Sequence, residues 1–186
     1  MVESPTYTVE RKDHDFEIRR YAGYILAQVD VESDFDGAVR EGFSILAHYI
    51  FGGNTQRTHI PMTAPVSREA LSGSERIPMT APVTEEKTGR RTYRISFTMP
   101  SKYTLEMLPE PEDKRIKFNV VKSHRAASIR FSGRLNEGLA DKKITELKNW
   151  LSENSITPQS NFIAAAYNAP YVPGPLRRDG IIVEIE

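Results

Sequence analysis

The same order of hydrophobic periodicities occurs twice along this chain of 186 residues. In each half, segments that alternate apolar and polar residues precede a segment with apolar residues at i, i+4, i+7 and i+11, and further alternating segments follow. Alternation is typical of strands with one buried face, and the wider spacing is typical of one face of a helix. No short β-α-β cycle is present, so the pattern predicts an α+β fold, with two helices packed against a mostly antiparallel sheet.

The two halves span about residues 15–99 and 116–186, and we predict one domain over residues 1–186 with an internal pseudo-twofold. The first helix is expected after the N-cap candidates Ser33 and Asp34, and the second after Asn136. Their apolar stripes are Val39, Phe43, Leu46 and Ile50 in the first helix, and Ala140, Ile144, Leu147 and Leu151 in the second. Strands are expected at 7–11, 16–21, 24–31, 92–99, 116–121, 127–131, 161–167 and 181–185.

One heptapeptide, Ile-Pro-Met-Thr-Ala-Pro-Val, occurs at 60–66 and again at 77–83. Two prolines in each copy forbid a helix and favour extended conformations. The copies are either Pro-bounded edge strands whose methionines fill gaps in the core, which we favour, or the lining of a pocket in which Met62 or Met79 contacts a ligand or its iron. The Pro-rich segment 167–178 is likewise either a lid over a ligand or a crossover between the last strands.

Composition excludes several classes of protein. Lys and Arg total 25 and Asp and Glu total 25, so the chain lacks the basic excess of a nucleic-acid binder or of a protein attracted to anionic membranes. The absence of cysteine excludes disulfides, thiolate haem ligation and iron–sulfur clusters. No apolar run suits a membrane span and the first twelve residues lack the apolar core of a secretory signal, so we expect a cytoplasmic protein.

Catalytic motifs are also missing. The sequence has no G-x-S-x-G elbow, P-loop, G-x-G-x-x-G or H-E-x-x-H, and its four histidines show no metal-ligand spacing. The sequence therefore offers no constellation of catalytic residues, and we expect no enzyme. The first helix carries the best candidate site, because Arg40, Ser44, Ala47 and His48 share one flank. A flat apolar ligand with carboxylates could lie there with Arg40 as its ion-pair partner. The residues alone favour the alternative, a solvated outer face of an amphipathic helix.

Several segments, in order over residues 6–186, make the chain similar to the SOUL haem-binding protein family. They are Phe16–Tyr21, Ile50–Asn54, the two Met-Thr-Ala-Pro-Val copies, Phe97–Leu105, Ile129–Gly133, and Tyr167–Pro170 followed by Arg177-Arg178. The resemblance implies a distorted antiparallel barrel flanked by two helices, built as a duplicated unit and similar to the effector-binding domains of some bacterial transcription regulators. It also implies haem or another tetrapyrrole as ligand, in a shallow apolar groove beside the first helix.

The resemblance assigns roles to particular residues. Basic side chains that face the propionates correspond to Arg40 and His48, with Phe43 and Ala47 as apolar neighbours. A third basic position, in the late loop, corresponds to Val172, so that contact is lost here. The residues implied for binding are Arg40, Phe43, Ser44, Ala47, His48, Tyr171 and Val172.

The sequence also departs from the family in the first hairpin. Some members carry a proposed axial histidine there, and this chain has Arg20 at that position. His48 then becomes the candidate iron ligand. The leading hypothesis is a haem or tetrapyrrole carrier or buffer, with no protein partner predicted. The alternatives are a small-molecule effector-binding module without haem, and an enzyme that acts on the bound ligand.

Overall fold

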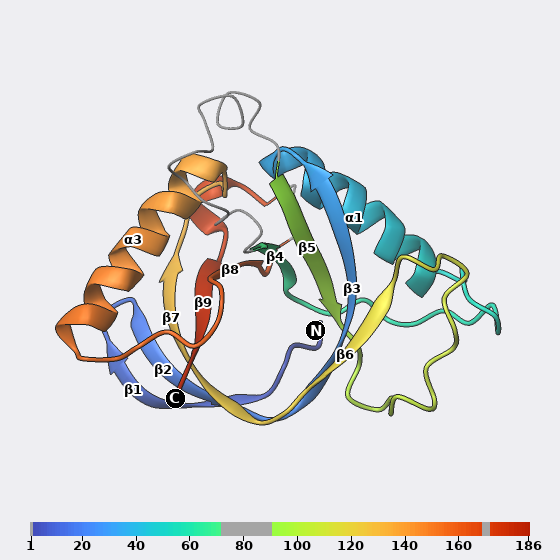
Figure 1. The fold of residues 1–186 in the computed structure, drawn as a ribbon, viewed down its shortest axis with the longest axis horizontal. Coiled ribbons are helices and arrows are strands. Elements are labelled where there is room, and N and C mark those ends of the chain that lie inside the picture. The colour runs from blue at the N-terminus through green and yellow to red at the C-terminus, as the bar shows by residue number, and fades with distance from the viewer. Residues whose placement is uncertain (1, 72–90, 169–171) are drawn as a thin grey trace, which may run out of the picture.

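A computed structural model describes residues 2–71, 91–168 and 172–186 of the chain. These residues form one sheet of nine antiparallel strands and two α-helices, α1 and α3, which lie on the outer sides of the curved sheet (Figure 1). The elements are β1 (Tyr7–Asp13), β2 (Phe16–Tyr21), β3 (Tyr24–Ser33), α1 (Phe35–Ile50), β4 (Val66–Ala70), β5 (Arg91–Thr98), β6 (Lys117–Val121), β7 (His124–Phe131), α3 (Glu137–Glu153), β8 (Ile163–Ala166), the 3-10 turn η2 (Gly174–Leu176) and β9 (Asp179–Ile185). The predicted α+β class with two helices on an antiparallel sheet is confirmed.

The strand order is β1-β2-β7-β9-β8-β4-β5-β3-β6. Apart from β1, exchanging β2, β3, β4 and β5 with β6, β7, β8 and β9 gives the same order in reverse, so β4 and β8 meet at the centre of a pseudo-twofold. The barrel that the resemblance implied is not closed. Among the described residues β1 pairs only with β2 and β6 only with β3, so the sheet has two free edges.

Helix α1 begins where the sequence predicts and faces the sheet in a different phase. The Asp34 side chain caps it by accepting a hydrogen bond from the Gly37 amide at 2.6 Å. Its buried residues are Phe35, Ala38, Gly42, Leu46, Tyr49 and Ile50. Phe43, which the spacing placed in the core stripe, is 38% exposed. The reason lies at Gly42, where an added Cβ would be 2.4 Å from Cγ1 of Ile95, so the missing side chain lets the helix approach β5.

Helix α3 follows the prediction more closely. Asn136 caps it by accepting a hydrogen bond from the Leu139 amide at 2.9 Å, and its buried residues are Ala140, Leu147, Trp150 and Leu151. The Trp150 ring stacks on Phe16 at 5.0 Å, and its Nε1 donates to Asp13 at 2.8 Å. This tryptophan therefore ties α3 to the first hairpin.

Two hydrophobic clusters hold the helices against the sheet. One joins α1 to β3 and β5, and the other joins α3 to β2, β7, β8 and β9. Strand residues that alternate with these core residues point to the opposite, inner face of the sheet. Neither α1 nor α3 combines the length and the apolar character that a bilayer-crossing helix needs, within the described part of the chain.

The first Pro-rich heptapeptide is not an edge strand, so that part of the favoured interpretation is wrong. Residues 60–65 lie outside the strands, and β4 begins only at Val66, between β8 and β5 in the interior of the sheet. Proline cannot donate to a ladder, which explains why pairing starts after Pro65. Ile60 is buried, and Met62 packs half-buried against the α1 cluster. The second copy, with Met79, lies outside the described residues.

Candidate functional site

The predicted binding residues of α1 all lie on its outer side, where they divide between two surfaces. Arg40 and Ser44 line a shallow groove of about 410 Å³. The groove is bounded by Ser33, Gly37, Arg40, Glu41, Ser44, Ile45 and Arg115. Phe43 sits elsewhere, with its ring packed edge-on against Phe97 at 5.4 Å. Ala47 and, in the late loop, Val172 are half-buried, and Tyr171 lies outside the described residues.

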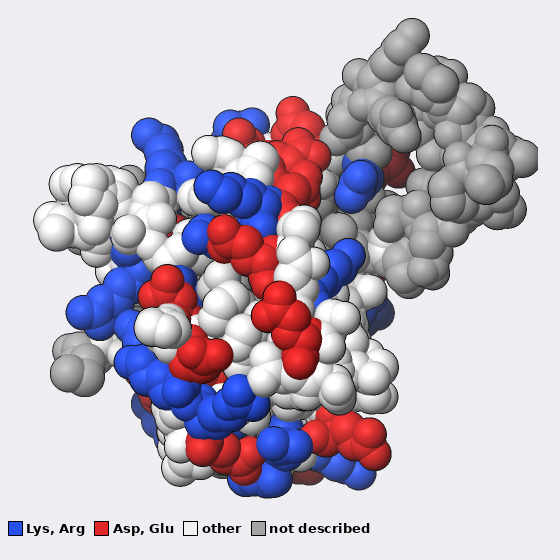
Figure 2. Space-filling model, turned by 90° about the vertical axis from the view of Figure 1, so that its left-hand side faces the viewer, with Lys and Arg blue, Asp and Glu red and all other residues white. Residues whose placement is uncertain are grey.

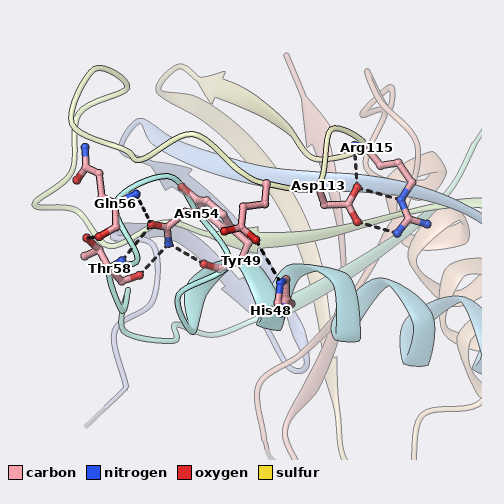
Figure 3. Close-up of polar contacts among 8 residues, drawn as sticks. His48, Tyr49, Asn54, Gln56, Thr58, Asp113 and Arg115 are labelled. Carbon is pink, nitrogen blue, oxygen red and sulfur yellow. Dashed lines mark hydrogen bonds and ion pairs between the residues drawn. The ribbon is translucent and has the colours of Figure 1, made fainter.

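Arg115 is a site residue that sequence reasoning missed. It brings a second cation to the groove of Arg40, from the segment that precedes β6. Asp113 holds its guanidinium with bonds of 3.0 and 2.7 Å, and this contact lowers the pKa of Asp113 to about 2 (Figure 3). Nothing in the spacing of a charged Pro-rich connector could place it beside α1, because that contact depends on tertiary packing.

His48 stands at the last turn of α1. Its Nε2 lies 3.9 Å from a carboxylate oxygen of Glu112, and its side chain is 68% exposed (Figure 3). Gly53 passes so close that an added Cβ would lie 2.4 Å from Cδ2 of His48. Within residues 2–71, 91–168 and 172–186, no three His, Asp or Glu side chains form a group that could hold a metal ion.

This donor set could hold the polar part of a haem. Arg40 and Arg115 could pair with the carboxylates of such a ligand, and the exposed His48 imidazole could bind its iron. Of the apolar side chains on the outer side of α1, Ile45 lines the groove, and Phe43 and Ala47 lie outside it.

A second hollow, here called the inner groove, lies on the inner face of the sheet, where the two halves meet. It measures about 440 Å³. Its aromatic side chains are Tyr21, Tyr24, His124 and Tyr167, and its charged ones are Glu69, Arg94, Lys122 and Glu184. The sequence contained a signal for it, since Tyr24, Leu26 and Gln28 alternate with buried core residues of β3. That alternation predicts a strand with one face in the core, but it does not show what the opposite face of the strand contacts.

Rings form a continuous cluster on one side of the inner groove. His124 stacks on Tyr21 at 5.4 Å with 13° between the planes, and Tyr24 meets His124 at 6.0 Å and Tyr21 at 6.2 Å. Burial raises the pKa of Tyr24 to about 12, and the charge of Glu184 adds to this effect. The groove thus combines aromatic faces with carboxylates.

Surface charge is mixed on the side of the molecule that carries α3. Figure 2 shows Lys and Arg side chains interspersed with Asp and Glu there. A nucleic-acid binder instead presents a basic patch or stripe.

Comparisons with known structures identify the fold. The C-terminal domain of EcmrR aligns with a TM-score of 0.66 at 10% identity, covering 97% of this chain and 98% of that one. A protein described as a hydrolase from Listeria innocua aligns with a TM-score of 0.60 at 10% identity, covering 95% and 94%. SAV2435 bound to tetraphenylphosphonium aligns with a TM-score of 0.52 at 8% identity, covering 92% and 93%. At such identities the likeness concerns the fold alone.

Sequence comparison identifies the family. A search of curated proteins finds no match. The family described as SOUL heme-binding protein matches residues 2–184, which is nearly the whole chain. The protein therefore belongs to the SOUL heme-binding protein family.

Proposed function

We propose that this protein binds haem or another tetrapyrrole against the outer face of α1, as a carrier or buffer without catalytic activity. One observation carries the proposal beyond family membership. Arg40, where the resemblance expects a propionate partner, shares its groove with a second cation, Arg115. Arg115 can replace the basic side chain that the late loop lacks at Val172.

The two arginines differ in whether their guanidinium group already has an ion-pair partner. Arg115 is bidentate to Asp113, so a propionate would have to join or displace that carboxylate. Arg40 has no ion-pair partner among the described residues. Most of the affinity would come from burying the apolar ring, and Arg40 would fix the orientation of its charged edge. His48 would ligate the iron through Nε2, in place of its contact with Glu112.

A haemin titration read by Soret absorption tests the function. We expect a saturable one-to-one shift for the wild-type protein. Arg40→Ala should weaken binding by about three- to fivefold, the scale of one exposed ion pair. His48→Ala should remove the spectral signature of imidazole ligation. Lys142→Ala and His14→Ala are matched controls, because Lys142 occupies the equivalent sixth position of α3 and the His14 side chain is 94% exposed.

The outcomes separate the parts of the proposal. Without a saturable shift, haem binding would be rejected in favour of an effector-binding module for another ligand. A normal spectrum in His48→Ala would reject iron ligation by His48 and leave binding at the groove intact. Equal weakening by Lys142→Ala would show that Arg40 acts only through overall charge.

A further inference from the structure

The inner groove is formed by the crossing of the two halves, away from the outer face of α1. Tyr21 of β2 pairs with His124 of β7, and Tyr24 of β3 pairs with Val121 of β6. These registers place the aromatic cluster where the β2–β3 turn of the first half lies beside the β6–β7 turn of the second half. Such rings offer negatively polarised faces to a ligand in the groove.

The charges around the inner groove leave a negative balance. Of its two cations, Arg94 is already neutralised by Asp30, with bonds of 2.8 and 3.1 Å. Lys122 has an exposed side chain. Two carboxylates face these groups. Glu69 lies opposite Arg94 in the register of β4 and β5 and accepts a hydrogen bond from Asn161 at 2.9 Å. Glu184, an exposed residue of β9, lines the groove together with Tyr24. The carboxylates therefore attract a cationic ligand and repel an anionic one.

The size of the inner groove limits the ligand to a small molecule. Its volume of about 440 Å³ falls within the range of roughly 300–1,000 Å³ that is usual for small-molecule sites. Aromatic faces beside a carboxylate are the environment in which proteins hold organic cations, since the ring quadrupole and the charge attract the same ligand. Polar residues such as Ser67, Ser96 and Gln28 complete the wall.

We propose that the inner groove is a second ligand site, which takes a small organic cation bearing aromatic rings. Glu184 supplies the charge, and Tyr24, Tyr21 and His124 supply the ring faces. The site goes beyond tetrapyrrole binding, because it shares no lining residue with the groove of Arg40 and Arg115. Both sites can be filled in one molecule.

Two probes of the same shape and opposite charge test the site. In isothermal titration calorimetry, tetraphenylarsonium should bind saturably with one-to-one stoichiometry. Tetraphenylborate should bind at least about tenfold more weakly, because its charge meets the carboxylates at close range. If the borate bound as tightly as the arsonium, or neither bound, the proposal would be overturned.

Substitutions then locate the site. Glu184→Gln keeps the shape and removes the charge of an exposed strand residue, and should lower arsonium affinity by about three- to fivefold. Tyr24→Ala should lower it by about tenfold through loss of a ring face, whereas Tyr24→Phe should preserve it. Glu153→Gln, the same change at the exposed end of α3, should have no effect. Unchanged affinity in Glu184→Gln would contradict the charge assignment.

The test also separates this site from the haem proposal. Arg40→Ala should leave arsonium affinity unchanged, and Glu184→Gln should leave the haemin titration unchanged. Competition between haemin and the arsonium would show a shared site and overturn the inference. If the protein bound haemin and did not bind the arsonium, the inner site would be rejected and the haem proposal would be retained.

Discussion

Arg19→Met is expected to lower the free energy of unfolding by about 3 to 4 kcal/mol, because it leaves a carboxylate buried without its main partner. Arg19 and Glu17 are each 3% exposed on β2, and Nε of Arg19 donates to Glu17 at 2.7 Å. The guanidinium also donates to the Tyr21 hydroxyl at 2.9 Å and lies 4.4 Å from the Tyr7 ring. Arg130 reaches Glu17 only at 3.6 Å, from a side chain 43% exposed, so it replaces little of the lost contact.

Urea denaturation followed by circular dichroism measures this effect. Arg20→Met is the matched control, since Arg20 is the next residue and pairs with Glu10 at 2.9 Å on the exposed side of the strand. Exposed pairs contribute at most about 1 kcal/mol, so the control should remain close to wild type. Equal losses in the two variants would show that burial of the Glu17–Arg19 pair contributes nothing specific.

A double variant distinguishes an unpaired charge from lost packing. Glu17→Leu combined with Arg19→Met removes both charges, and replacing a buried pair by apolar residues is often nearly neutral. The double variant should therefore be more stable than Arg19→Met alone, a coupling that only neighbouring residues show. If instead the stability losses of the single variants Glu17→Leu and Arg19→Met add up in the double variant, the destabilisation by Arg19→Met comes from lost packing.

The buried pair also matters for the inner groove. Burial raises the pKa of Tyr21 and of Tyr167, and the positive charge of Arg19 opposes the increase at both hydroxyls. Both tyrosines line the inner groove. Arg19 therefore positions the Tyr21 side chain of that wall through its hydrogen bond to the hydroxyl, and Glu17 holds the Arg19 guanidinium.

Local sequence signals predicted most elements of the fold. The strand at 16–21 has the predicted bounds, and the caps at Asp34 and Asn136 are confirmed because capping depends on a few adjacent residues. Strand β4 was missed, since five residues of mixed polarity carry no clear alternation and their burial follows from two neighbouring strands. The phase of α1 was misjudged because an apolar count ignores Gly42, whose contact with Ile95 sets the helix against β5.

The candidate sites were harder to predict, because each joins residues from distant segments. Arg115 reaches the groove of Arg40 only after the sheet has formed, and the inner groove needs strands from both halves. The binding roles of Arg40, Phe43, Ser44, Ala47 and His48, with Tyr171 and Val172, stay predictions. So does the division of the chain at about 15–99 and 116–186.

Asn54→Ala is expected to lower the free energy of unfolding by about 3 kcal/mol, because one fully buried side chain makes four hydrogen bonds. Its Nδ2 donates to the carbonyl oxygens of Tyr49 at 3.0 Å and Thr58 at 2.8 Å. Its Oδ1 accepts from the amides of Gln56 at 3.2 Å and Thr58 at 3.0 Å (Figure 3). Alanine would remove the side-chain partner of all four groups, and the Tyr49 carbonyl would lose it in a buried position.

The loss of stability should appear first as local opening of this turn, before the whole protein unfolds. Hydrogen exchange at the Thr58 amide should accelerate in Asn54→Ala under native conditions, whereas Gln56→Ala, an exposed change in the same turn, should leave exchange and stability near wild type. This turn places Gly53 against His48, and the Gly53 carbonyl accepts from the Glu112 amide at 3.1 Å. Loosening it should therefore free His48 from both neighbours. If Asn54→Ala is as stable as Gln56→Ala, the turn is held by backbone contacts alone, and Asn54 has no part in fixing the end of α1.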